Sequence, residues 1–142
     1  MLNKTLGKFF RDYSAALANY SIDDLAKFYH TPCLLSSPDN LVLLNTAQAF
    51  KQNFSATLAS LSAANVCAFK ALDTCYQIIN PSLILVNIIW QFFDHKQFLF
   101  TEFSATYQLV NQNDKWQIVQ VISQDIEQAL ALENPFTLQE ER

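Results

Sequence analysis

The sequence predicts an α+β domain in which three N-terminal helices pack on a curved antiparallel sheet. Two observations carry this prediction. Apolar residues recur at helical spacing over the first part of the chain, and from Val66 onward they alternate with a period of two. The later strands are joined by hairpin-length connections, so neighbouring strands are expected to run antiparallel. Helices that precede a block of strands are typical of an α+β domain.

The N-terminal half predicts three helices and two short extended segments. The first helix spans about residues 5–20, with Tyr13 on its apolar face. Ser21 and Asp24 resemble a capping box and begin a short second helix. The segments "CLLSS" and "DNLVLLN" follow, and then Asn45 or Thr46 caps a third helix. The apolar face of that helix carries Phe50, Phe54, Leu58 and Leu61.

Four strands are predicted at about residues 66–79, 83–93, 97–110 and 115–124. The most apolar of them, "LILVNIIWQFF", is interrupted by Asn87 and Gln91. A membrane-spanning helix needs about 20 consecutive apolar residues, so this run predicts a strand of a soluble sheet and no membrane partner.

A hairpin tip at His95 and Lys96 places Phe92 opposite Leu99, and this pairing assigns the side chains to two faces. The face expected to pack on the helices carries Ile84, Val86, Ile88, Trp90, Phe92, Leu99, Thr101, Phe103, Ala105, Tyr107, Trp116, Ile118, Gln120 and Ile122. The opposite, outer face carries Leu85, Asn87, Ile89, Gln91, Glu102, Ser104, Thr106, Gln108, Val119 and Val121.

The chain has the length of one domain, with no linker and no repeat. Residues 1–126 are predicted to form that domain. Residues 127–142 are expected to add a short helix, ended by Pro135, and a frayed acidic tail.

Composition excludes several classes of function. The formal net charge is -4 and the basic residues are scattered, so a nucleic-acid partner is not expected. The single glycine, Gly7, excludes glycine-rich phosphate loops and the cofactors that they bind. Neither histidine has a cysteine or carboxylate at metal-ligand spacing, so no metal site is expected. Charges within the first residues exclude a signal peptide, which predicts a cytoplasmic protein.

Two segments carry a resemblance to a known family, "RDYSAALANYSIDDLAKFYHTP" near the start and "TYQLVNQNDKWQIVQV" near the end. With the order of elements, they make the chain similar to the nuclear transport factor 2-like superfamily, over about residues 5–125. That superfamily includes the ketosteroid isomerases, scytalone dehydratase and the polyketide cyclases. The resemblance implies a cystatin-like cone of helices on a curved sheet, whereas activity varies widely within the superfamily.

The first segment looks especially like the ketosteroid isomerases. The resemblance places their oxyanion-donating tyrosine on Tyr13, their aspartate base on Ser37 and their second donor near Thr106. A serine without an adjacent base cannot carry a proton between carbons, so ketosteroid isomerisation is not expected. Any catalysis would be isomerase-, cyclase- or dehydratase-like, and proton abstraction would then need Asp73, His30 or a group of the substrate.

Two functions are carried forward. In the first, the cone between helices and sheet binds a small hydrophobic ligand. The residues expected to line that site are Tyr13, Trp90, Thr101, Phe103, Ile118 and Gln120. In the second, the chain is a non-catalytic dimerising module, and aromatic side chains fill the cone. The twelve phenylalanines of the sequence favour this function, because bulky rings fill the space that a ligand would occupy.

A homodimer is expected in either case. Leu85, Ile89, Val119 and Val121 give the outer sheet face a half-apolar character. Such a face suits a self-complementary interface.

Overall fold

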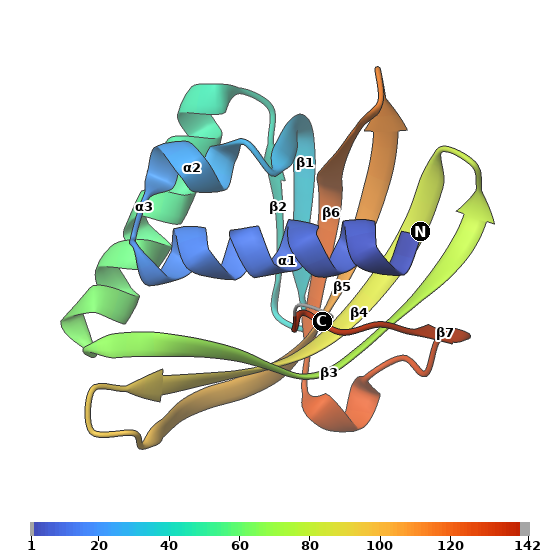
Figure 1. Ribbon diagram of the computed structural model, residues 1–142. Helices are drawn as coiled ribbons and strands as arrows, with labels where there is room; N and C mark the ends of the chain where they lie inside the picture. The colour runs from blue at the N-terminus through green and yellow to red at the C-terminus, as the bar shows by residue number, and fades with distance from the viewer. Residues whose placement is uncertain (1, 140–142) are drawn as a thin grey trace.

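The computed structural model describes residues 2–139 and confirms the α+β architecture. Three helices are present, α1 (Leu2–Ala18), α2 (Ile22–Ala26) and α3 (Ala47–Ala63). Ser21 Oγ caps α2 by accepting the Asp24 amide at 3.2 Å, and Thr46 Oγ1 caps α3 by accepting the Ala49 amide at 3.1 Å. Helix α1 crosses in front of the sheet, while α2 and α3 lie at one end of it (Figure 1).

The strands form one seven-stranded sheet in the order β2-β1-β6-β5-β4-β3-β7. Strands β1 and β6 pair in parallel, and the other neighbours are antiparallel. The bounds are β1 Tyr29–Ser37, β2 Asn40–Leu44, β3 Val66–Asn80, β4 Leu83–Asp94, β5 Leu99–Gln112, β6 Lys115–Gln124 and β7 Asn134–Pro135. The four long strands lie close to their predicted ranges, and the curved sheet encloses the core against α1.

The register between β4 and β5 differs from the predicted register by two residues. Phe92 pairs with Thr101, not with Leu99, and Trp90 pairs with Phe103. A shift of two residues leaves each side chain on its face, because side chains alternate with a period of two. Residues 84–92 of β4 and 101–107 of β5 therefore keep their predicted faces. Leu99 does not: after a register shift it pairs with Phe93 of the outer face and is exposed, which corrects its predicted position.

The pairing of β5 with β6 contains a bulge. Leu109 lies opposite Ile118, whereas Gln108 lies opposite Gln120, so Val119 is an extra residue on β6. An extra residue bends the strand and inverts the face of everything after it.

The bulge corrects three predicted positions. Gln120 and Ile122 lie on the outer face, and not on the helix-facing side. Val121 lies opposite Tyr107 and is only 9% exposed, so it belongs to the core and not to the outer face.

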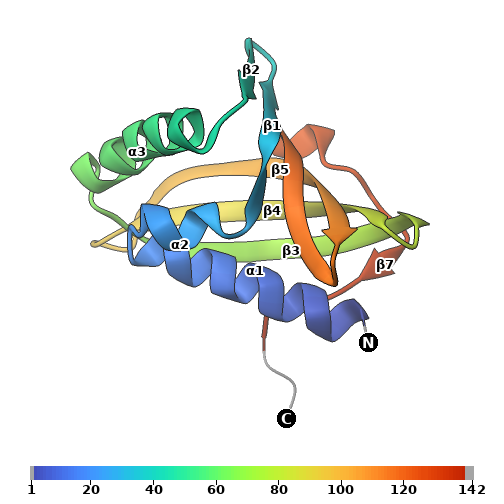
Figure 2. The same cartoon turned by 90° about the horizontal axis from the view of Figure 1, so that it is seen from above.

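The segment after β6 is not the helix that the sequence predicts. One 3-10 turn covers Ile126–Gln128, and Pro135 lies in β7. Hydrogen bonds to the edge of β3 replace those of a helix, as in the pairing of Asn134 with Tyr76. We call residues 125–139 the C-terminal strap. It leaves β6 on the side of the sheet opposite to α1 and passes round to β3 (Figure 2). The remainder of the expected tail, residues 140–142, lies outside the described residues.

The end of the strap packs on the helix side of the sheet instead of fraying. The Phe136 ring is buried against Phe10 of α1 and Tyr76 of β3. Arg11 Nη1 donates to the Leu138 carbonyl at 2.9 Å. A Cβ on Gly7 would lie 2.4 Å from the Thr137 carbonyl oxygen, closer than any real contact.

Replacing Gly7 by Ala tests whether this close approach seats the strap. We expect Gly7→Ala to displace the strap, because a backbone carbonyl cannot turn aside as a side chain can. Hydrogen exchange at the amides of residues 136–139 should then become faster. In a chain that ends at Pro135 the same change should instead stabilise α1 by about 1 kcal/mol, since alanine favours a helix. Unchanged exchange in the full chain would contradict this account.

Candidate functional site

The interior of the cone is a layer of aromatic rings around Tyr13. Tyr13 is buried and contacts Phe10 and Phe28 with ring centroids 5.8 and 5.7 Å apart. It also lies against Trp90 and Tyr107, at 6.2 and 5.9 Å. Helix α1 brings Tyr13 and Phe10 to this layer because residues three apart share a helix face.

The polar atoms of these rings bond one another. The hydroxyls of Tyr13 and Tyr29 are 2.7 Å apart, and either of them can donate. Trp90 Nε1 donates to the Tyr107 hydroxyl at 2.8 Å, and the rings of Tyr13 and Tyr107 are in contact. Three tyrosines and one tryptophan, from α1, β1, β4 and β5, therefore form one group that two hydrogen bonds and ring contacts hold together. We call these four residues the tyrosine cluster.

Burial sets the protonation state of the tyrosine cluster. Burial raises the pKa of Tyr13, Tyr29 and Tyr107 well above the ordinary value near 10, and the neighbouring phenols raise it further for Tyr13 and Tyr107. Burial also raises the pKa of the nearby Cys33 thiol to about 12. These groups are neutral at physiological pH, so they can orient a proton but cannot abstract one.

Five of the six predicted site residues share the helix-facing side of the sheet or α1. Tyr13, Trp90 and Ile118 are buried, and Thr101 and Phe103 are half-buried. The sixth, Gln120, lies on the outer face as described above, so the structure does not bring it to Tyr13.

Sequence reasoning misses the polar partner of Tyr13, the Tyr29 hydroxyl. Alternation along β5 places Tyr107 on the correct face but does not reveal its bond to Trp90. Tyr29 received no position, because its place depends on the parallel pairing of β1 with β6, where Tyr29 lies opposite Ile118. Alternation within one strand contains no signal of that pairing.

The residues considered as bases lie elsewhere. His30, Ser37 and Asp73 are exposed, and Ser37 Oγ donates to the Asn40 carbonyl at 3.4 Å within the β1–β2 turn. Within residues 2–139 no group of three histidines, cysteines or acidic residues is placed to hold a metal ion. The tyrosine cluster therefore receives no acid–base partner from His30, Ser37 or Asp73.

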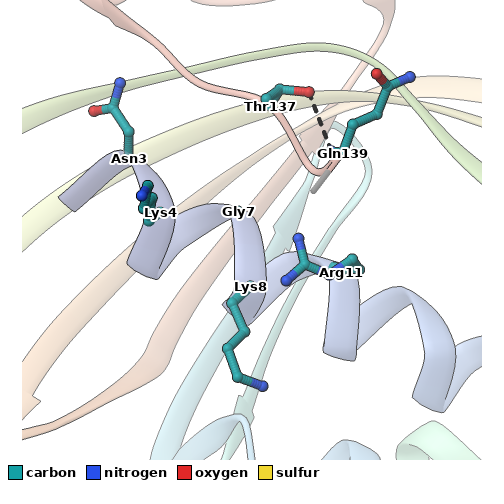
Figure 3. Close-up of a pocket in the computed structure, with 7 residues that line it drawn as sticks. All are labelled: Asn3, Lys4, Gly7, Lys8, Arg11, Thr137 and Gln139. Atoms are coloured by element: carbon teal, nitrogen blue, oxygen red, sulfur yellow. Dashed lines mark hydrogen bonds between the residues drawn. The ribbon is translucent and has the colours of Figure 1, made fainter. Parts of the chain in front are cut away.

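The larger hollows lie at the surface. A groove of about 240 Å³ runs between α1 and the strap, lined by Asn3, Lys4, Gly7, Lys8, Arg11, Thr137 and Gln139 (Figure 3). Lys8 Nζ lies 2.6 Å from an Asp12 carboxylate oxygen, which offsets part of the positive charge. A second hollow, of about 520 Å³ and mostly polar, lies between Ser37, Gln124 and Asp125.

One small hollow reaches the edge of the tyrosine cluster. It has a volume of about 80 Å³ and is lined by Ala26, Tyr29, Thr31, Ala47, Phe50 and Lys51. None of these three hollows is lined by Tyr13 or Trp90.

No helix within the described residues combines the length and the apolar character that crossing a membrane requires.

Comparison with known proteins identifies the fold. Residues 3–126 match the profile of a family described as "NTF2-like protein (DUF6841)". The strap beyond residue 126 lies outside that match. No curated protein matches the chain.

Solved structures resemble the chain at low sequence identity. An NTF2-like protein of unknown function from Shewanella oneidensis has a TM-score of 0.73 and 13% identity, covering 88% of this chain and 100% of that one. A protein from Xanthomonas campestris, provisionally named a calcium/calmodulin-dependent protein kinase II association domain, has a TM-score of 0.66 and 12% identity, covering 87% of each chain. A provisionally named ketosteroid isomerase from Shewanella frigidimarina has a TM-score of 0.65 and 14% identity, covering 81% and 90%.

The buried phenols predict a loss of stability in alkali. A folded-state pKa above the unfolded value near 10 stabilises the protein below that pH, and the contribution is lost as the pH rises above about 10. We expect three of the five tyrosines to ionise together with unfolding. Ultraviolet absorbance of tyrosinate, followed beside circular dichroism, measures both events. Ionisation of all five tyrosines in a protein that stays folded would contradict the assignment.

Proposed function

The chain belongs to this family of NTF2-like proteins, and we propose that it serves as a non-catalytic module that associates with a second copy of itself. One observation carries the proposal: side chains whose polar atoms bond one another fill the interior of the cone. This is the alternative that the sequence left open beside a ligand-binding cone.

The filled interior argues against catalysis in the cone. The Tyr13 hydroxyl is hydrogen-bonded to that of Tyr29, so a ligand that bonds Tyr13 would have to displace a buried neutral partner. Phe50 and Phe54 stack at 4.4 Å beside Tyr29 and occupy the side where the cone meets α3. A polar group left unpaired in this layer costs about 1–3 kcal/mol, which opposes entry of a ligand.

The outer sheet face supports self-association. Two rows of side chains cross it from β2 to β3 without a charged residue. The first row is Leu43, Leu34, Gln120, Gln108, Leu85 and Gln77. The second row is Leu41, Ser36, Ile122, Thr106, Asn87 and Cys75. At the β2 end, Leu41 and Leu43 are 67% and 57% exposed.

The strap limits which part of this face a second copy can contact. It lies over the β3 end of the second row, where Leu132 N donates to Cys75 Sγ at 3.4 Å. The open part is therefore the β2, β1 and β6 side, with Leu41, Leu43 and Ile122. An uncharged, half-apolar surface of this kind suits an isologous contact. The association domain named for the Xanthomonas campestris protein is a precedent for association on this fold.

Binding of a small hydrophobic ligand in the cone is a second candidate, supported by the 80 Å³ hollow beside Tyr29. A ligand entering there would have to move Phe50. The hollow is smaller than most ligand pockets, which measure about 300–1,000 Å³, so this function requires rearrangement of the aromatic layer.

Charges placed on the open outer face test the association. We expect Leu41→Lys with Leu43→Lys to convert a dimer into a folded monomer, because each copy would have to bury two ammonium groups in the interface. Multi-angle light scattering at micromolar concentration measures the mass. Phe98→Lys is the matched control, since Phe98 is as exposed as Leu41, at 67%, but lies at the β4–β5 tip. A monomeric unmodified protein would overturn the proposal.

The tyrosine cluster separates the two candidates. If it is a filled core, Tyr13→Phe should cost about 1 kcal/mol of unfolding free energy through one lost hydrogen bond. Tyr13→Phe and Tyr29→Phe together should cost less than the sum of the single changes, because both remove the same bond. Chemical denaturation measures these energies. A hydrophobic ligand retained in native mass spectrometry of the unmodified protein, and lost in Tyr13→Phe, would favour the second candidate.

A further inference from the structure

The strap leaves a hollow between itself and the outer face of β3 and β4. Its volume is about 320 Å³, which lies at the lower end of the range for small-molecule pockets. The sheet contributes Asp73, Cys75, Asn87 and Ile89, and the strap contributes Ala129 to Leu132 as a roof. This place is separate from the tyrosine cluster and from the open part of the outer face.

Asn87 is the polar group at the floor of the hollow. It is only 3% exposed. Its amide nitrogen donates to Ser104 Oγ and to Thr106 Oγ1, both at 2.8 Å. These two bonds fix the amide plane, and no donor among residues 2–139 reaches the other end, Oδ1. Oδ1 is not among the buried side-chain atoms that lack a partner, so it is accessible from the hollow, where a donor of a bound ligand can take the place of water.

Asp73 adds a negative charge at the side of the same hollow. It lies on β3 two residues before Cys75, and it pairs with Ile89, the neighbour of Asn87 on the outer face of β4. One carboxylate oxygen accepts the Thr74 amide at 3.0 Å. No ion pair within the described residues involves Asp73. Diagonal neighbours on paired strands lie about 7–8 Å apart, which a small ligand can span.

The Cys75 thiol, a third polar side chain of the hollow, is already hydrogen-bonded to the strap. It donates to the Leu130 carbonyl at 3.4 Å and accepts from the Leu132 amide at 3.4 Å. The hollow therefore offers two acceptors, one of them charged, and no free donor from Cys75. Ile89, Leu130 and Leu132 supply apolar walls.

We propose that the hollow under the C-terminal strap binds a small primary ammonium ion with a short apolar body. The ammonium group donates to Asn87 Oδ1 and to the Asp73 carboxylate, and charge makes the second bond the stronger of the two. The body lies between Ile89 and the strap. This site does not depend on the proposed self-association.

Cys75 makes the site measurable, because a ligand in the hollow shields its thiol. In a Cys67→Ser background Cys75 is the accessible thiol, since Cys33 is fully buried and Cys67 is exposed. The probe is benzylammonium, and the readout is the rate of Cys75 alkylation by iodoacetamide, followed by mass spectrometry. We expect saturable slowing by benzylammonium, and at least tenfold weaker protection by benzyl alcohol, which has the same size without the charge.

Asp73→Asn tests the assignment. It keeps an oxygen for the Thr74 amide and should weaken the protection by benzylammonium at least tenfold, with the melting temperature unchanged. Asp125→Asn is the matched control, because it removes the same charge from an exposed position at the start of the strap and should leave protection unchanged. The proposal is overturned if benzylammonium gives no saturable protection, if benzyl alcohol protects equally, or if Asp73→Asn protects as well as the unmodified chain.

Discussion

The packing of α1 on the sheet depends on buried rings whose polar atoms bond one another. The Tyr13 hydroxyl of α1 bonds that of Tyr29 on β1, and Trp90 on β4 donates to the Tyr107 hydroxyl on β5. A phenol left alone in this layer would cost about 1–3 kcal/mol, so the elements hold one another in place. The same pairing engages the Tyr13 hydroxyl, which an enzyme of this shape would present to a substrate. Stability of the core and the engagement of this hydroxyl therefore have one cause.

How far the sequence predicts this arrangement depends on the alternation of side chains between the two faces of a strand. An error of two residues in the β4–β5 register leaves Trp90 and Phe103 on the correct face, so alternation was sufficient there. On β6 the bulge at Val119 shifts the face by one residue, and Gln120 leaves the predicted site. The segment "QIVQVI" has apolar residues on both faces, so its pattern cannot reveal the bulge.

Contacts between distant parts of the chain account for the other errors. Tyr29 reaches Tyr13 because β1 pairs in parallel with β6, and the strap is extended because β3 offers an unpaired edge. Neither cause leaves a local pattern. The one signal in the sequence was Gly7, a glycine inside a helix where alanine is favoured by about 1 kcal/mol. Its meaning becomes clear only when the Thr137 carbonyl is seen to occupy the place of a Cβ.

The two ends of the outer sheet face offer different groups to a partner, because the strap covers one end of an uncharged surface. Toward β2, leucines are exposed, and burial of such apolar area would favour the proposed contact with a second copy. Toward β3, Ser104 and Thr106 hold the Asn87 amide, so the sheet presents an oxygen where a packed strap would need apolar atoms. The strap bonds to Cys75, and a hollow lined by Asn87 lies between the strap and the sheet. Asp73 lies just outside the uncharged rows and gives the hollow a negative charge. A large partner is therefore suited to the open end, and a small cation to the covered end.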